Sequence, residues 1–185
     1  MKDHDHWNSP LEGPNRGRGA AVGYWFNIGL ASTCTISVKK DGTVSLVEGN
    51  PDIGGSRASI AMQAAEVLGI RAEDVVPTIV DTDLTGFTAL TAGSRTTFAT
   101  GWAAYEAAED VKTQMKSRAA VIWDVLVDSV QFTDGVFHSK TDPELKMTFK
   151  ELAGRLLDTG GPIVGRATVH PKGVGGSAAG MIVDV

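Results

Sequence analysis

The stretch TAGSRTTFATGWAAYEAAEDVKTQMKSRAAVIWDVLV, residues 91–127, decides the fold class of this 185-residue chain. From residue 98 onward it contains no proline, and its apolar side chains recur at the three- and four-residue spacing of one helix face. It therefore predicts a single helix over residues 98–127, much longer than the usual length of about 11–12 residues. A helix of that length can cross a whole domain, and we expect the other elements to pack along it.

Strand signals lie on both sides of this helix. Asp41-Gly42 and Asp134-Gly135 are typical of tight hairpin turns, and each is flanked by runs of β-branched and aromatic residues. The predicted strands cover residues 19–28, 33–39, 43–48, 74–80, 130–132, 136–138, 163–169 and 178–185. Two shorter helices are predicted over residues 59–68 and 148–157, the second opened by a Thr148–Glu151 capping box. The predicted class is α+β, with mixed β-sheets packed against one long and two shorter helices.

The composition argues against several classes of function. With a net charge of −5, the chain lacks the broad basic surface that nucleic-acid-binding proteins generally carry. The single cysteine, Cys34, excludes an internal disulfide framework and an iron–sulfur cluster held by this chain alone. No apolar run approaches the roughly 20 residues that span a bilayer, and no secretory signal is visible, so the expected location is cytoplasmic. Residues 1–18 are expected to form an irregular lead-in, with a domain over residues 19–185.

The first candidate site is the turn-rich segment Gly54, Gly55, Ser56 and Arg57, which directly precedes the predicted helix at residues 59–68. Two glycines before a helix N-terminus let backbone N–H groups approach an anion closely, and the helix dipole favours negative charge there. Arg57 would add a charge-assisted hydrogen bond. The alternative is a tight loop that only turns the chain, with Ser56 as the N-cap of the helix.

The second candidate site is the hydroxyl-rich segment before the long helix, formed by Thr91, Gly93, Ser94, Arg95 and Thr96. Hydroxyls and amides donate hydrogen bonds and the guanidinium neutralises charge, which is the chemistry of an anion cradle. The alternative is a cluster of ordinary helix caps. Two such loops, each opening a helix, suggest that one anionic ligand bridges both.

Other chemistry-bearing residues have simpler interpretations. Asp81 and Asp83 either bind Mg²⁺ or form a turn, and the turn is favoured. Cys34 lies in the strand predicted at residues 33–39 and is interpreted as a buried structural thiol. His4 and His6 belong to a polar terminus that at most holds a metal weakly. The residues alone indicate no catalytic set and no metal site.

Taken together, several motifs of this chain resemble the molybdenum-cofactor-binding large subunit of the xanthine dehydrogenase, aldehyde oxidase and aerobic carbon monoxide dehydrogenase family. The resemblance covers residues 16–185, in matching order and spacing. It rests on GRGAAVGYW at 17–25, KKDGTVSLVEGNPDIGGS at 39–56, AAEVLGI at 64–70, EDV at 73–75, DTD at 81–83, TAGSRTTFATG at 91–101 and GGPIVGRATVHPKG at 160–173.

The resemblance implies that residues 19–185 are part of a molybdenum-cofactor-binding domain. Its cofactor would be molybdopterin, in the cytosine dinucleotide form usual in bacteria, held by the loops at 53–56 and 91–96. The complete enzyme would oxidise aldehydes, N-heterocycles or carbon monoxide and pass electrons to 2Fe-2S clusters and FAD on partner subunits. The implied partners are the remaining part of the large subunit and the iron–sulfur and FAD subunits. Self-association through apolar residues 20–28 and Val185 is also expected.

Three departures from the family pattern point to an incomplete site. Gly54 and Gly55 are adjacent, where the family has a glutamine between two glycines. The glycine-rich segment that carries the family's catalytic glutamate and the upstream phenylalanine-glycine loop are both absent from this sequence. The chain is therefore expected to be inactive alone, and no catalytic residue is assigned. The alternatives are a non-catalytic module for another phosphorylated ligand and a structural interaction domain.

Overall fold

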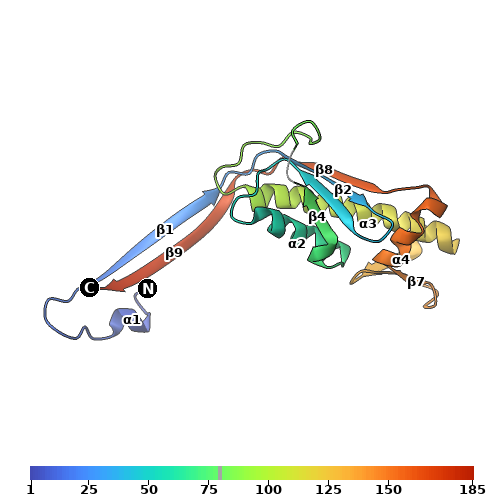
Figure 1. Ribbon diagram of the computed structural model, residues 1–185. Helices are drawn as coiled ribbons and strands as arrows, with labels where there is room; N and C mark the ends of the chain where they lie inside the picture. The colour runs from blue at the N-terminus through green and yellow to red at the C-terminus, as the bar shows by residue number, and fades with distance from the viewer. Residues whose placement is uncertain (79–80) are drawn as a thin grey trace.

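A long two-stranded ribbon projects from the body of the protein, which holds the long helix and the other sheets (Figure 1). A computed structural model describes residues 1–78 and 81–185, without the side chains of residues 174–175. The body contains a four-stranded sheet, two helices along one face of it, and a smaller three-stranded sheet. The predicted α+β class is confirmed.

The four-stranded sheet has the strand order β4-β3-β2-β8. Its strands are β2 (Ser32–Val38), β3 (Val44–Glu48), β4 (Val75–Thr78) and β8 (Val164–Val169). The central strand β2 pairs antiparallel with both neighbours, and the Asp41-Gly42 turn joins it to β3 as predicted. β3 and β4 are parallel because helix α2 (Ser56–Leu68) and a 3₁₀ turn (Ala72–Asp74) connect them. Of the strand predicted at residues 74–80, the last two residues lie outside the described chain.

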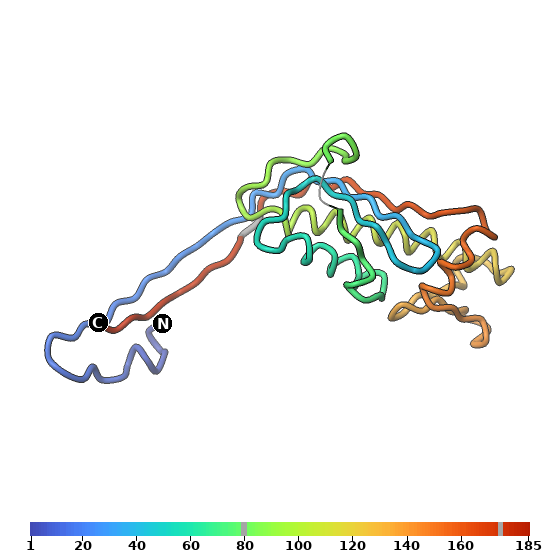
Figure 2. Tube along the Cα trace, viewed as in Figure 1, coloured from blue at the N-terminus to red at the C-terminus, as the bar shows by residue number. Residues whose placement is uncertain are grey.

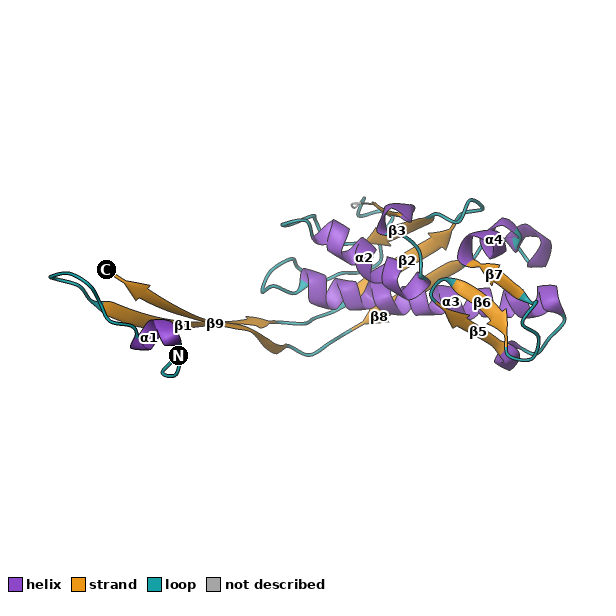
Figure 3. Cartoon of the chain, turned by 90° about the horizontal axis from the view of Figure 1, so that it is seen from below, coloured by secondary structure: helices purple, strands orange, loops and turns teal. Residues whose placement is uncertain are grey.

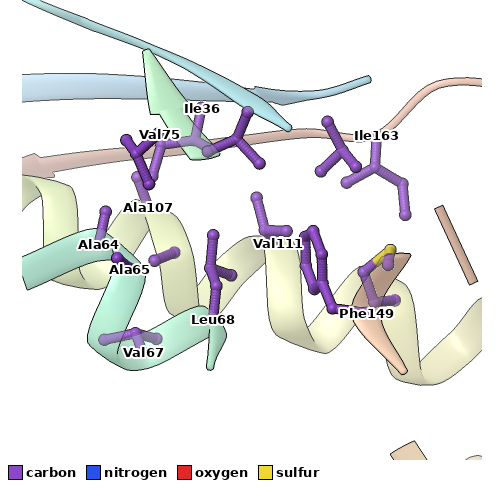
Figure 4. Packing of buried hydrophobic residues seen from close by; sticks show 14 of the residues in the cluster. Ile36, Ala64, Ala65, Val67, Leu68, Val75, Ala107, Val111, Phe149 and Ile163 are labelled. Atoms are coloured by element: carbon purple, nitrogen blue, oxygen red, sulfur yellow. The ribbon is translucent and has the colours of Figure 1, made fainter. Parts of the chain in front are cut away.

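Helices α2 and α3 (Gly101–Trp123) cover one face of this sheet (Figures 1 and 3). Figure 4 shows Ile36 and Val75 from the sheet meeting Leu68 of α2 and Val111 of α3. The buried positions of α3 are mostly alanine, which allows the sheet and α2 to approach its backbone closely. These alanines are Ala103, Ala104, Ala107, Ala108, Ala119 and Ala120.

The long helix is shorter than predicted at both ends. A π-helical turn, η2 (Thr96–Thr100), precedes it, so that the chain takes more residues per turn where the candidate loop joins the helix. The helix ends at Trp123 because Asp124 takes a left-handed conformation with φ 52°, which an apolar pattern does not reveal. The prediction of one helix over residues 98–127 was therefore too long.

A smaller sheet lies near the C-terminal end of α3. It contains β5 (Val130–Thr133), β6 (Val136–Ser139) and β7 (Lys146–Thr148), preceded by a 3₁₀ turn (Val127–Ser129). The Asp134-Gly135 turn joins β5 to β6 as predicted, with φ of 47° and 79°. Helix α4 (Phe149–Gly154) begins with the predicted capping box, and a 3₁₀ turn (Leu156–Thr159) follows it. β7 was not predicted.

The ribbon pairs β1 (Arg18–Asn27) antiparallel with β9 (Val174–Asp184), bringing together strands more than 140 residues apart. Figure 2 shows both chain ends at its tip. Helix α1 (Asp5–Asn8), a single turn within the expected irregular lead-in, lies at this tip. Gly17 and Val185 exchange backbone hydrogen bonds of 3.0 and 2.9 Å, so the two ends of the ribbon are tied together.

Candidate functional site

The two candidate loops meet at one cavity of about 360 Å³. It lies where α2 and the η2–α3 segment both begin. Of the predicted site residues, Ser56, Thr91, Ser94, Arg95 and Thr96 line it, together with Ile53, Ala92 and Thr97. Gly54, Gly55, Arg57 and Gly93 do not line it. The spatial meeting of two segments about 40 residues apart is what a ligand bridging both loops requires.

The first backbone N–H groups of η2 make no hydrogen bond within the described residues. Among the hydrogen bonds of the described residues, the N–H groups of Thr96, Thr97 and Phe98 have no acceptor, because each would need a carbonyl before the helix begins. Ala99 is the first to donate, to the Arg95 carbonyl at 2.6 Å. Unused amides at a helix N-terminus attract anions. The hydroxyls of Ser94 and Thr96, from residues that line the same cavity, add further polar groups.

Arg95 does not act as the free cation that the sequence suggested. Its side chain is fully buried, and its guanidinium hydrogen bonds are all made inside the protein. Burial lowers its pKa, while the nearby Glu48 opposes that shift. The acceptors are the carbonyls of Gly29, Leu30, Ala31, Ala89 and Leu90 and the hydroxyl of Ser32, at 2.5–3.3 Å. Arg95 therefore fixes the backbone beneath the cavity, and its expected contact with a ligand stays a prediction.

Arg57 is likewise engaged inside its own loop. The Asp52 carboxylate accepts the backbone N–H of Arg57 at 3.0 Å and lies 3.7 Å from the Arg57 Nε. Asp52 thus already supplies the negative group that the N-terminus of α2 favours. Ser56 is the first helical residue and not the predicted N-cap; its hydroxyl accepts the Ile53 N–H at 3.2 Å. Asp52 therefore braces loop 52–57 from within, while the N–H groups of Gly54 and Gly55 donate to no acceptor among the described residues.

The glycines of the two loops have different roles. Gly93 has φ 59°, and a Cβ there would lie 2.8 Å from the Ile28 side chain, so glycine is needed for packing. Gly54 and Gly55 also have positive φ, but a Cβ at either would meet nothing within 4 Å. Their backbone faces open space that the described residues leave unfilled.

A chain of buried polar side chains connects the sheet to loop 91–97. Asn50 donates from its amide to Thr91 Oγ1 at 2.5 Å and accepts a short hydrogen bond from Thr100. Thr100 also contacts Ser32 Oγ at 2.9 Å, which links the chain to Arg95. Sequence reasoning missed this set because each residue looks ordinary alone. The available signal was a polar Glu-Gly-Asn run at the end of an apolar strand.

Glu48 anchors the same chain of hydrogen bonds. Its carboxylate accepts the Asn50 backbone N–H at 2.6 Å. The side chain is buried, and this burial raises the pKa of the carboxyl despite that hydrogen bond and the positive charge of Arg95. Loop 91–97 is thus held from beneath by ionisable and hydroxyl groups that hydrogen-bond to one another and to the backbone.

An apolar groove of about 660 Å³ adjoins the cavity at Thr97 and runs between α2 and α3. Its walls include Met62, Phe98, Trp102 and Tyr105. Trp102 is 44% exposed and lies at the surface. Chemistry in the cavity would therefore take place beside a partly aromatic face whose one charged lining residue is Glu66.

The other candidate residues have structural roles. Asp81 accepts the Asp83 backbone N–H at 3.0 Å, which is the expected turn. Cys34 is buried as expected, and burial raises the pKa of its thiol. In the described part of the chain, no group of three or more His, Cys, Asp or Glu side chains is placed to hold a metal ion. None of the described helices has the length and apolar character needed to cross a bilayer.

Comparison with known proteins identifies the family. The family described as the molybdopterin cofactor-binding domain matches residues 3–181, nearly the whole chain. The chain belongs to this family. The structure resembles CO dehydrogenase from Oligotropha carboxidovorans (TM-score 0.80, 23% identity, 92% of this chain and 24% of that chain). It also resembles quinoline 2-oxidoreductase from Pseudomonas putida 86 (TM-score 0.73, 24% identity, 92% and 25%).

A more distant likeness is to the aldehyde oxidoreductase of Desulfovibrio desulfuricans (TM-score 0.53, 19% identity, 92% of this chain and 18% of that chain). At these identities the likeness concerns the fold. The molybdopterin-binding domain described here spans about a quarter of the length of the first two enzymes. The resemblance inferred from the motifs is confirmed at the level of the family and fold.

Proposed function

We propose that the cavity between Ile53, Ser56 and loop 91–97 holds a phosphate or another anionic part of the molybdopterin cofactor. The observation that supports this is the pair of unused N–H groups at Thr96 and Thr97, two residues that line a cavity shared by both candidate loops. The donor set fits an anionic, hydrogen-bonding group. Because Arg95 is engaged inside the protein and Arg57 lies beside Asp52 and does not line the cavity, amides and hydroxyls would provide the binding.

The residues of this site divide into two roles. Ser94, Thr96 and Thr97 would contact the cofactor, through hydroxyls and backbone amides. Thr91 and Arg95 would hold the loop in place, since their polar atoms already bond to Asn50 and to backbone carbonyls. Gly54 and Gly55 would let another part of the cofactor pass close to the backbone. The whole cofactor is larger than this cavity, so further contacts must come from residues beyond those that line it.

We further propose that the chain is part of a molybdenum hydroxylase large subunit. When bound, the cofactor supplies the redox centre for oxidising aldehydes, N-heterocycles or carbon monoxide. The cytosine dinucleotide form, and FAD and 2Fe-2S clusters on partner subunits, belong to this proposal, as does inactivity of the chain alone. The family match gives no support to a module for another phosphorylated ligand or to a purely structural domain. A cytoplasmic location stays a prediction from the sequence.

Thr97 offers a direct test of the cradle. Thr97→Asp places a carboxylate at the N-terminus of a helix, where negative charge stabilises the helix but repels an anionic ligand. Thr97→Asn has nearly the same shape without the charge and is the matched control. In the complete enzyme, matured with its insertion factors, the aspartate variant should lose most molybdenum and pterin fluorescence while keeping its thermal stability. Equal cofactor content in both variants would refute the site, and a wild-type complex without pterin would refute the function.

A further inference from the structure

Gln63 of helix α2 reaches the start of the neighbouring helix and contacts η2. The helices α2 and α3 run side by side (Figure 3), and Gln63 lines the apolar groove between them. Its Nε2 donates a hydrogen bond to the Thr97 carbonyl at 3.3 Å. Thr97 lines both this groove and the anion cavity. Gln63 therefore joins the middle of α2 to a residue of the cavity wall.

Gly101 makes room for this side chain. A Cβ at position 101 would lie 1.8 Å from Gln63 Oε1, so any other residue there would displace the amide. The backbone of Gly101 is ordinary right-handed helix, with φ −60° and ψ −39°, so its conformation does not require glycine. Glycine is also less favourable than alanine within a helix. The close approach of the Gln63 amide is thus what calls for glycine at this position.

The Gln63 amide is held in this orientation at a cost in stability. Its Oε1 is buried and accepts no hydrogen bond from the described residues, and a buried acceptor without a donor destabilises a fold. Turning the amide over would set Oε1 against the Thr97 carbonyl oxygen, so the N–H side must face Thr97. An apolar side chain of the same length would avoid the cost. What distinguishes Gln63 from such a side chain is the donor that it gives to Thr97.

This donor completes the π-helical turn. In an α-helix the Gly101 N–H would donate to the carbonyl four residues earlier, which is that of Thr97. Here it donates to the carbonyls of Thr96 and Phe98 instead. The Gln63 amide takes the place of the Gly101 N–H at the Thr97 carbonyl. Without it, we expect the Gly101 N–H to return to Thr97 and η2 to become an α-turn.

The form of this turn decides where the open donors of loop 91–97 lie. A π-turn holds one residue more than an α-turn, so its loss would rotate the residues at its start about the axis of α3 by about 100°. The N–H groups of Thr96 and Thr97, which use no acceptor among the described residues, would move with them. Their place at the cavity therefore depends on η2 keeping its π form.

We propose that Gln63 is a positioning residue for the anion cavity. By donating to the Thr97 carbonyl, it holds η2 in the π form and keeps the Thr96 and Thr97 N–H groups at the cavity. Gln63 does not itself line that cavity. The inference rests on the proposed function, because the donors that Gln63 positions are those that the anion would use.

Long-range HNCO spectra of the 185-residue chain test the π-turn, because they identify the carbonyl to which a given N–H donates. In the wild type, the Gly101 N–H should couple to the Thr96 carbonyl carbon. Gln63→Met has nearly the same length without the amide, and it should move that coupling to the Thr97 carbonyl carbon. Its urea midpoint should stay equal or rise, because the buried acceptor is gone. A coupling to Thr97 in the wild type, or to Thr96 in both chains, would overturn the proposal.

Titration with inorganic phosphate, followed at the amide signals of Thr96 and Thr97, tests the effect on the cavity. Gln63→Met should raise the dissociation constant about fivefold, the effect of about one weakened hydrogen bond. Gln114→Met is the matched control, because Gln114 also donates to a backbone carbonyl, that of Val164 at 2.9 Å, and neither residue lines the cavity. Equal affinity in the wild type and Gln63→Met would refute the role of Gln63 and leave the anion cavity standing. Wild-type amides that phosphate does not shift would refute the cavity itself, and this inference with it.

Discussion

Replacing Arg95 by alanine should destabilise the protein far more than loss of a ligand-binding side chain would. The guanidinium serves five backbone carbonyls and the Ser32 hydroxyl, all in a region where Arg95 itself is fully buried. A buried polar group left without a partner costs about 1–3 kcal/mol. Water entering the space relieves some of this, so we expect a loss of at least about 4 kcal/mol of unfolding free energy. That loss is a large fraction of the stability of an ordinary domain.

Urea unfolding followed by far-ultraviolet circular dichroism measures the effect. Arg95→Lys is the informative control, because it keeps the positive charge but has three donors in place of a planar fork of five. It should recover about half of the lost stability. If Arg95→Ala unfolds within about 1 kcal/mol of the wild type while the complete enzyme loses its cofactor, Arg95 contacts the ligand directly and the positioning role is wrong.

Three further predictions concern packing and titration. Gly165→Ala should cost about 3 kcal/mol or more, because its Cβ would lie 2.3 Å from the Ala107 carbonyl oxygen, whereas Gly19→Ala, with open space around it, should change the urea midpoint little. Because burial raises the pKa of Glu48, its protonated form favours folding, so stability should fall as pH rises above about 4.5 towards the raised value. Glu48→Gln should flatten that slope in urea titrations at several pH values, and an unchanged slope would exclude Glu48 as its source. Hydrogen bonding to Arg18 lowers the pKa of Asp184 to about 2, so this pair stabilises the ribbon above the ordinary value of 3.8 and weakens as pH falls towards 2. Arg18→Gln should return the Asp184 titration, followed by NMR, towards its ordinary range; no movement would contradict the pairing.

Features set by local chemistry were predictable from the sequence. Asp134-Gly135 gave the expected hairpin, because few other residue pairs adopt two successive positive φ angles. Thr148 and Glu151 formed the capping box, and Gly69 ended α2 in the left-handed conformation. The two hydroxyl- and glycine-rich loops were recognised as helix openings, and they do line one cavity.

Features set by distant segments were not predictable. An arginine among threonines and serines looks exposed, and only the folding of residues 29–32 around it shows that Arg95 is buried. Asp52 lies five residues before Arg57, and nothing in the spacing indicates that its carboxylate occupies the helix N-terminus. β1 and β9 carry no charged residues apart from Arg18 and Asp184, which face each other at the tip. The sequence therefore gives little indication that these two strands pair.

The position of both chain ends at the tip of the ribbon has a mechanical consequence. A force applied between residues 18 and 184 would open the β1–β9 pairs one after another, as a zipper opens, and would not shear many hydrogen bonds at once. Each pair resists alone, so the ribbon would yield at low tension and lengthen before any load reached the helices or the cavity. The strand pair thus yields before the body does when residues 18 and 184 are pulled apart.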